Sequence, residues 1–271
     1  MESPADEASY IYNAVFISDV HLGTRNSQAA ALLDFLRHVH CDTLYLVGDI
    51  VDLWKVRRGP HWPQSHNDVM QKILRKARKG TRVVFVPGNH DEGLRDYCGM
   101  NFGGIELRRD CIHEAANGKK YLVMHGDEFD VIVRYARWLA FLGDRSYELL
   151  LALNTPLNWT RRCLGFGYWS LSNFMKQKVK GAVNFIGEFE EALVEEARRR
   201  GADGLISGHI HHANDRDIGG IHYLNSGDWV ESCTAIGERA DGTFEILHWH
   251  EVMTARSRHA SPQLPVLEKA A

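Results

Sequence analysis

Short apolar runs alternate with amphipathic stretches through the first third of the chain. Residues 14–18, 43–47 and 82–86 are rich in Val, Ile, Leu, Phe and Tyr and have the length of buried strands. Between them, residues 28–39 and 69–77 repeat apolar side chains at the spacing of an amphipathic helix. This alternation of strand and helix predicts an α/β fold.

Each of these predicted strands is followed by a polar residue that can bind a metal ion. Asp19 follows the first strand, Asp49 the second and Asn89 the third. In open α/β sheets, ligands gather at the carboxyl ends of the strands. We therefore expect a site along one edge of the sheet.

The second half of the chain adds a helical stretch and then returns to strands. Residues 121–124 form a further apolar run that leads into His125, and residues 204–207 form another that leads into His209 and His211. Residues 182–200 predict an amphipathic helix, and short β segments are expected at 220–224, 233–237 and 243–249. We expect one domain over residues 10–250, a helical insertion over 129–181 within it, and a disordered polar tail over 254–271.

Composition and charge exclude several classes of protein. The net charge of -3 gives no basic field for nucleic acid, so no nucleic-acid partner is expected. The five cysteines form no CxxC pair, which favours a reducing, cytoplasmic setting. No signal peptide is visible, and no apolar run reaches the ~18 residues that a membrane-spanning helix needs.

Five short motifs share one arrangement, in which a metal-binding side chain follows an apolar strand. They are Asp19-Val20-His21, Gly48-Asp49, Gly88-Asn89-His90-Asp91, His125-Gly126 and Gly208-His209-Ile210-His211. Carboxylate oxygen, amide oxygen and imidazole nitrogen together suit Mn²⁺, Fe or Zn²⁺ rather than Ca²⁺. Each motif is weak alone, because a lone histidine is more often structural, but five motifs in this order point to one metal centre.

With these motifs the sequence resembles the calcineurin-like metallophosphoesterase superfamily over about residues 14–249. The resemblance implies an α/β sandwich of two mixed β-sheets flanked by helices, and two divalent metal ions, most simply Mn²⁺, with Fe or Zn²⁺ as alternatives. It implies that the first metal is held by Asp19, His21 and His211, the second by Asn89, His125 and His209, and that Asp49 bridges them. The expected reaction is attack of a metal-bridging hydroxide on phosphorus, with the metals ~3.5–4 Å apart.

His90 and Asp52 are the expected catalytic residues beyond the metal ligands. In metallophosphoesterases of the protein-phosphatase type, the Gly-Asp-x-x-Asp spacing seen here from Gly48 to Asp52 pairs the second Asp with the His of the Asn-His motif. A carboxylate partner fixes the imidazole tautomer. We expect His90 to protonate the leaving oxygen or to hydrogen-bond a phosphoryl oxygen; the alternative is a structural histidine that caps the loop.

A more specific resemblance is to the UDP-2,3-diacylglucosamine pyrophosphatase family of lipid A biosynthesis. It is carried by the apolar helical cap insertion, from Phe129 to about Lys180, which in that family shelters acyl chains. The expected substrate is therefore UDP-2,3-diacylglucosamine or a related nucleotide-diphosphate lipid, met at the inner membrane surface. Expected substrate contacts are Arg25, Lys176, Lys178 and Lys180.

Two alternatives stay open at this point. Members of that family usually carry Arg after the Asn of the Asn-His motif, whereas this chain has His90, as in the broader superfamily. A general metallophosphodiesterase or phosphomonoesterase acting on a soluble phosphoester such as a nucleotide is therefore the second hypothesis. A catalytically dead scaffold is disfavoured because such proteins typically lose ligands, and all seven are present here.

Overall fold

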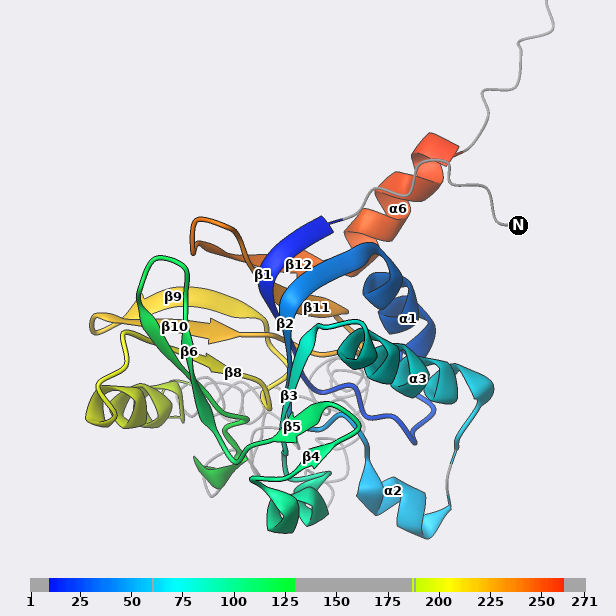
Figure 1. Ribbon diagram of the computed structural model, residues 1–271, viewed down its shortest axis with the longest axis horizontal. Coiled ribbons are helices and arrows are strands. Elements are labelled where there is room, and N and C mark those ends of the chain that lie inside the picture. The colour runs from blue at the N-terminus through cyan, green and yellow to red at the C-terminus, as the bar shows by residue number, and fades with distance from the viewer. Residues whose placement is uncertain (1–9, 60, 130–186, 188, 261–271) are drawn as a thin grey trace, which may run out of the picture.

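Two β-sheets lie at the centre of the computed structural model, which describes residues 10–59, 61–129, 187 and 189–260 (Figure 1). The first sheet has seven strands in the order β12-β11-β1-β2-β3-β5-β4. Its strands are β1 (Tyr10–Ile17), β2 (Val39–Val47), β3 (Arg82–Val86), β4 (Asn101–Phe102), β5 (Ile105–Leu107), β11 (Thr234–Glu238) and β12 (Phe244–His248). The second has five strands in the order β6-β7-β8-β10-β9. Its strands are β6 (Cys111–Glu114), β7 (Lys120–Val123), β8 (Gly204–Ser207), β9 (Asn214–Ile218) and β10 (Ile221–Asn225).

Both sheets are mixed. In the first, β1, β2, β3 and β5 run parallel, and β11, β12 and β4 are antiparallel to their neighbours. In the second, β7, β8 and β10 run parallel, with β6 and β9 antiparallel at its edges. The expected sandwich of two mixed sheets is therefore confirmed.

Helices cover the outer faces of both sheets. On the first sheet lie α1 (Ala29–His38) and α3 (Gln64–Arg78), and residues 189–199 form a helix against the second. The shorter elements are α2 (Leu53–Arg58), the 3₁₀ helices η1 (Glu92–Tyr97) and η2 (Asp127–Phe129), and α6 (Trp249–Ala260). In the described residues, no helix is both long and apolar enough to cross a bilayer.

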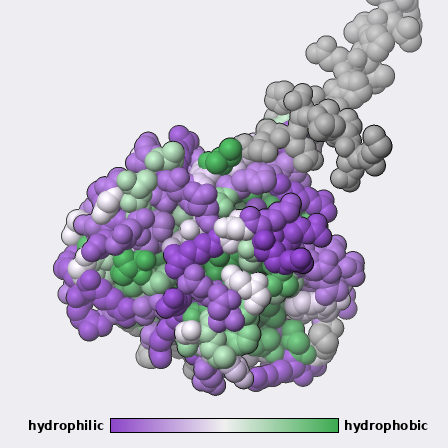
Figure 2. Space-filling view, in the orientation of Figure 1, coloured by the Kyte–Doolittle hydropathy of each residue, from purple (hydrophilic) through white to green (hydrophobic). Residues whose placement is uncertain are grey.

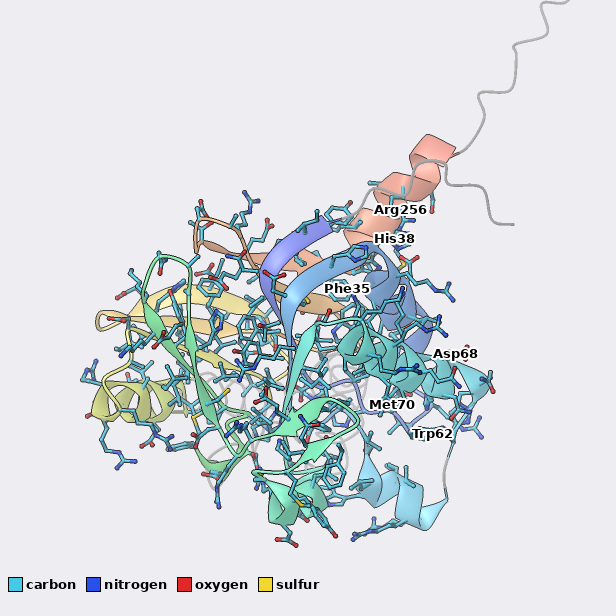
Figure 3. All side chains as sticks on the ribbon, in the orientation of Figure 1. Phe35, His38, Trp62, Asp68, Met70 and Arg256 are labelled. Carbon is cyan, nitrogen blue, oxygen red and sulfur yellow. The ribbon has the colours of Figure 1, made fainter. Side chains whose placement is uncertain are left out.

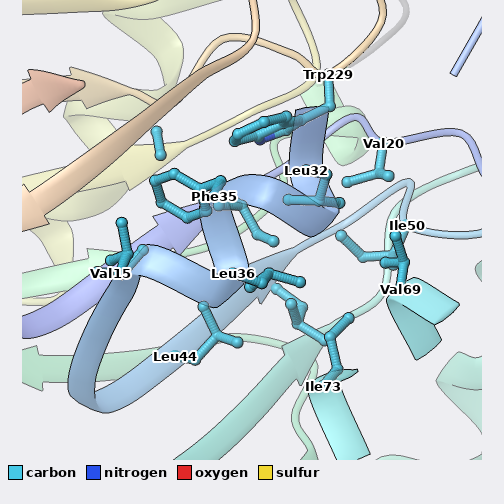
Figure 4. Packing of buried hydrophobic residues seen from close by; sticks show 14 of the residues in the cluster. Val15, Val20, Leu32, Phe35, Leu36, Leu44, Ile50, Val69, Ile73 and Trp229 are labelled. Atoms are coloured by element: carbon cyan, nitrogen blue, oxygen red, sulfur yellow. The ribbon is translucent and has the colours of Figure 1, made fainter. Parts of the chain in front are cut away.

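The hydrophobic core has three layers because alternate residues of a strand point to opposite faces. Val15 and Ile17 of β1 belong to the layer beneath α1 and α3, where Phe35 and Ile73 pack (Figure 4). Phe16, one position along, belongs to the layer between the two sheets and stacks on Tyr45, with ring centroids 4.6 Å apart. The third layer joins the second sheet to the helix of residues 189–199.

The C-terminal region differs from the sequence prediction. Residues 254–260, expected to be disordered, form the end of α6, so this expectation is wrong for them; residues 261–271 lie outside the described part of the chain. Two side-chain hydrogen bonds join α6 to α1. Trp249 Nε1 donates to Asp34 Oδ2 at 2.9 Å. Arg256 Nη2 donates to His38 Nε2 at 2.7 Å; these two residues are labelled in Figure 3. The predicted cap insertion, residues 129–181, lies outside the described residues except for Phe129.

Candidate metal centre

The seven predicted ligands lie in loops that follow five different strands. Asp19 and His21 follow β1, Asp49 follows β2 and Asn89 follows β3. His125 follows β7, and His209 and His211 follow β8. Because β1, β2 and β3 are parallel, and β7 and β8 are parallel, each set of loops emerges at one edge of its sheet.

The side chains of these loops converge into overlapping groups. Potential ligand atoms lie within 4.8 Å of one another in each of three groups: Asp19, His21 and His211; Asp49, His125 and His209; and His21, Asp49 and His90. His211 Nε2 lies 3.1 Å from Asp19 Oδ1, and His125 Nε2 lies 3.5 Å from Asp49 Oδ2. His21 connects the two sides, since its Nε2 is 3.8 Å from Asp49 Oδ2.

The loops hold one atom of each buried ligand and leave another facing the centre. Asp49 Oδ1 accepts the His90 backbone N–H at 2.8 Å, and Asp19 Oδ2 accepts the His209 backbone N–H at 2.8 Å. His125 Nδ1 lies 2.8 Å from the Val47 carbonyl oxygen. Buried atoms of the predicted ligands that make no hydrogen bond to a described residue include Asp19 Oδ1, Asp49 Oδ2, Asn89 Oδ1 and His125 Nε2. Buried polar atoms are costly to leave unpaired, so this set of oxygen and nitrogen donors fits divalent cations.

Backbone conformation at the ligands is unusual. Positive φ values occur at Asp19 (51°), His21 (51°), Asp49 (54°), His209 (72°) and His211 (55°). Among described non-glycine residues, only Cys233 shares this feature. The left-handed region is sparsely populated by residues with a Cβ, and such strain concentrates at functional sites. The fold therefore maintains costly backbone geometry where the side chains converge.

Two glycines make this convergence possible. A Cβ on Gly88 would lie 2.3 Å from Asp49 Oδ1 and 2.6 Å from His125 Nε2. A Cβ on Gly208 would lie 2.7 Å from Asp19 Oδ2 and 2.5 Å from the Ser18 side chain. Any larger residue at either position would push the ligands aside.

The charges of the cluster are mutually dependent. Burial alone would raise the pKa of Asp19, but the nearby His211 imidazole holds that pKa well below its ordinary value. Burial would lower the pKa of His125, yet the Asp49 carboxylate outweighs burial and raises it to about 10. The Asp49 carboxylate therefore favours the protonated imidazole of His125, and cation binding competes with that proton.

His90 lies at the rim of this cluster beside Asp52. His90 Nδ1 is 3.1 Å from Asp52 Oδ2, and its Nε2 is 4.0 Å from Asp49 Oδ2. The other oxygen of Asp52 accepts the Lys55 backbone N–H at 2.8 Å, so the same carboxylate caps helix α2. The side chain of His90 is 14% exposed, and its ring centroid lies 4.3 Å from that of Trp54.

The structure does not test the four predicted substrate contacts. Arg25 is exposed in the loop after His21, and no ion pair joins it to a described residue. Lys176, Lys178 and Lys180 lie outside the described residues.

Two buried carboxylates support the ligands: Asp91, which the sequence motif included without assigning it a role, and Asp228, which sequence reasoning missed. Asp91 accepts the backbone N–H groups of Gly88 (2.6 Å) and Ile50 (2.8 Å), and burial together with Asp49 raises its pKa to about 6. Asp228 Oδ2 lies 3.8 Å from His211 Nδ1. The signal for Asp228 was present, because Gly227-Asp228 follows β10 as Gly48-Asp49 follows β2.

The chain is similar to several known proteins. The family model for the calcineurin-like phosphoesterases matches residues 12–213. A UDP-2,3-diacylglucosamine hydrolase of Neisseria meningitidis is 30% identical over 235 residues, covering 84% of this chain and 94% of the relative. One of Pectobacterium carotovorum is 32% identical over 241 residues, covering 88% and 91%. The solved structure of Yfce, a phosphoesterase from E. coli, is 13% identical with a TM-score of 0.42, over 87% of this chain and 98% of Yfce. The chain belongs to the calcineurin-like phosphoesterase family of metal-dependent hydrolases.

Proposed function

We propose that this protein hydrolyses the pyrophosphate bond of UDP-2,3-diacylglucosamine or a closely related nucleotide-diphosphate lipid. The observation that carries the hydrolytic part is the convergence of unpaired carboxylate, amide and imidazole atoms from five loops. The substrate is supported by the two hydrolases above, which match this chain over most of its length. The chain would act in the cytoplasm at the inner membrane surface.

The proposed ligand assignment divides the cluster into two metal sites. Asp19, His21 and His211 would hold one divalent cation. His125 and His209 would hold the other, together with Asn89, whose buried Oδ1 is unpaired. Asp49, with its Oδ2 between His125 and His21, would contact both. Mn²⁺ is our first choice because mixed oxygen and nitrogen ligands suit it.

Two bound cations would supply Lewis acidity to the phosphoryl oxygens and an acidified water as the nucleophile. The protein's own contribution is geometric and electrostatic. The N–H of His90 holds Asp49 Oδ1, and the N–H of His209 holds Asp19 Oδ2, so neither carboxylate can rotate away from the centre. Such fixed dipoles cost no reorganisation during the reaction.

His90 and Asp52 are proposed to handle the leaving group. A proton on His90 Nδ1 would face Asp52 Oδ2, which lies 3.1 Å away, and the carboxylate would favour that proton position. In its imidazolium form His90 also carries a proton on Nε2, which faces the cluster, and this N–H can hydrogen-bond a phosphoryl oxygen or transfer its proton to the leaving oxygen. Arg25, Lys176, Lys178 and Lys180 are proposed as contacts for the phosphates and the anionic part of the substrate.

A second candidate is hydrolysis of a soluble phosphoester such as a nucleotide. The observation that favours it is His90 itself, a residue with acid–base capacity held by Asp52 at the rim of the cluster. In this alternative the same two-metal hydrolysis of a phosphoester acts on small soluble substrates.

Three substrates separate the candidates when each is supplied with Mn²⁺. They are UDP-2,3-diacylglucosamine, unacylated UDP-N-acetylglucosamine and bis-p-nitrophenyl phosphate. We expect the acylated substrate to have the highest kcat/KM and to yield UMP. Asp49→Asn serves as the matched inactive control, because it keeps the volume and removes the charge between the metals. No preference for the acylated substrate would refute the lipid assignment, and no hydrolysis of any of the three would refute the function altogether.

A further inference from the structure

Exposed apolar side chains gather where α3 meets β4 and η1, outside the metal centre. The exposed fractions are 38% for Leu74, 49% for Tyr97, 52% for Met100 and 48% for Phe102. Single exposed apolar residues are common, but a contiguous group marks a contact surface for a membrane or another macromolecule.

Several contacts show that these side chains form one surface. The rings of Tyr97 and Phe102 meet edge to face, with centroids 6.2 Å apart. Phe102 pairs with Ile105, which belongs to the core layer beneath α3, so Phe102 points to the α3 side of the sheet. Leu74 Cδ2 lies 3.3 Å from the position of a Cβ at Gly103, the residue after Phe102. The exposed apolar side chains therefore continue from β4 onto α3.

Basic side chains border this group on α3. Arg75 and Arg78 are exposed one and four positions after Leu74, and Lys79 follows the helix. No described acidic residue forms an ion pair with any of these three side chains. Helix η1 carries two exposed acidic residues, Glu92 and Asp96, against these three basic side chains. Figure 2 shows exposed hydrophobic side chains next to strongly hydrophilic ones on the face where Figure 1 places α3 and β4.

We propose that this region, here called the α3–β4 surface (Leu74, Arg75, Arg78, Lys79, Tyr97, Met100 and Phe102), docks the protein onto an anionic lipid bilayer. Aromatic and long apolar side chains insert at the boundary between headgroups and acyl chains, while Arg and Lys reach the lipid phosphates. A partner chain adding a strand at this edge is disfavoured, because β4 has only two residues to pair with it.

Helix η1 connects the α3–β4 surface to the loops of the metal centre. Helix η1 begins directly after Asp91, and Arg95 within it donates to both carboxylate oxygens of Asp127, at 2.6 and 2.7 Å. Asp127 is two residues beyond His125. A bilayer on the α3–β4 surface would therefore have a fixed position relative to the cluster. The inference rests on the proposed function for its purpose, since an acylated substrate is met at a bilayer, but docking needs no substrate and is measured without it.

The test is co-sedimentation of the full-length protein with vesicles of phosphatidylcholine alone or mixed with phosphatidylglycerol. We expect binding to the anionic vesicles only, weakened by raising NaCl, because surface charges are screened. Arg75→Gln/Arg78→Gln/Lys79→Gln should weaken partitioning roughly 100-fold, at about fivefold for each basic residue. Tyr97→Ser/Met100→Ser/Phe102→Ser should weaken it at least ~10-fold.

Matched controls lie outside the α3–β4 surface, on or beside β1, β6, β7 and β11. Lys119→Gln/Lys120→Gln/Arg239→Gln removes the same charge from exposed positions near the start of β7 and the end of β11. Ile11→Ser/Ile112→Ser removes exposed apolar side chains, which are 79% and 43% exposed. Both controls should keep wild-type partitioning, and hydrolysis of bis-p-nitrophenyl phosphate should be unchanged in the surface variants, which verifies their folding.

Several outcomes would overturn the proposal. They are failure of the wild-type protein to bind anionic vesicles, equal binding to neutral vesicles, and equal losses in the control variants. Sedimentation velocity tests whether the surface instead binds a second copy of this chain. If the surface variants abolish self-association and leave vesicle binding intact, the surface is an interface between copies and the bilayer proposal is wrong. The protein could fail to hydrolyse UDP-2,3-diacylglucosamine and still bind anionic vesicles through the α3–β4 surface. That result would refute the proposed substrate and support the docking surface.

Discussion

The backbone N–H of His90 donates to Asp49 Oδ1 at 2.8 Å, so the loop after β3 holds the carboxylate presented by the loop after β2. This one bond links the residue proposed to act on the leaving group to the residue proposed to lie between the metals. It also fixes which oxygen of Asp49 faces the cluster, because Oδ2 is the one left without a hydrogen bond to described residues. Movement of either loop would therefore disturb both the proposed metal ligand Asp49 and the position of His90.

Gly88→Ala should disrupt the metal centre while leaving the fold intact. The added Cβ would lie 2.3 Å from Asp49 Oδ1 and 2.6 Å from His125 Nε2. Both side chains are buried, so neither can move away without displacing its neighbours. A ligand displaced by ~1 Å costs about 100-fold in rate. Metal content by elemental analysis and kcat/KM with bis-p-nitrophenyl phosphate are the measurements. Gly93→Ala, whose nearest neighbour atom would be 3.9 Å away, is the control, and equal behaviour of the two variants would contradict the prediction.

Asp228→Asn should weaken metal binding without unfolding the loop that carries it. Asp228 Oδ1 accepts the backbone N–H groups of Val230 (2.7 Å) and Glu231 (2.6 Å), and an asparagine oxygen can keep both bonds. The amide NH₂ would replace Oδ2, which lies 3.8 Å from His211 Nδ1, and would remove the negative charge behind that ligand. Loss of such a supporting carboxylate typically costs ~10–100-fold in metal affinity.

The measurement for Asp228→Asn is Mn²⁺ titration calorimetry on metal-free protein. Asp241→Asn is the matched control, since Asp241 is an exposed carboxylate in a distant turn. Wild-type affinity in Asp228→Asn would exclude this supporting role.

Removal of metal should lower thermal stability. The carboxylates of Asp19 and Asp49 are both fully buried, and without cations they rely on neighbouring imidazoles for compensation. Binding to the native state alone stabilises by about 2.7 kcal/mol when free metal is 100 times Kd, which is roughly 5–10 °C in Tm for a domain of this size. Scanning calorimetry with EDTA and with Mn²⁺ measures the difference. The increase in Tm on adding Mn²⁺ should be much smaller for Asp49→Asn than for the wild-type protein. An equal increase in Tm would show that the metal binds elsewhere.

Much of the fold and the site could be predicted because the decisive signals are local. Apolar runs such as 82–86 have the length of a strand, and the motif Gly88 to Asp91 follows within a few residues. Each ligand is therefore identified by its own short segment. The sandwich of two mixed sheets, by contrast, came from the family resemblance, because pairing between distant strands has no local signal.

Elements without an apolar pattern were missed. Strand β9 reads Asn-Asp-Arg-Asp-Ile and lies at the edge of its sheet, where side chains face water and no hydrophobic alternation is needed. Helix α6 looked like a polar tail, and its stability depends on Trp249 reaching Asp34, which is 215 residues away in the chain. Asp228 likewise acquires its role only when β10 and β8 are brought side by side.

His90→Ala should separate catalysis from metal binding, whereas Asp52→Asn should affect both, because Asp52 Oδ2 also lies 3.6 Å from His21 Nδ1. His90 touches the cluster through its Nε2, 4.0 Å from Asp49 Oδ2, but its side chain is proposed to act on the leaving group. Loss of a general acid costs ~10²–10⁴-fold, so His90→Ala should lose that much kcat with its metal content unchanged.

Asp52→Asn should lose less, because asparagine still caps α2 by accepting the Lys55 N–H and the imidazole is still present. Substrates with leaving groups of different basicity provide the control: a highly acidic leaving group needs no proton, so the deficit of His90→Ala should shrink with it. An unchanged rate in metal-loaded His90→Ala would remove His90 from the mechanism. A deficit independent of the leaving group would instead assign His90 to stabilising the phosphoryl oxygens.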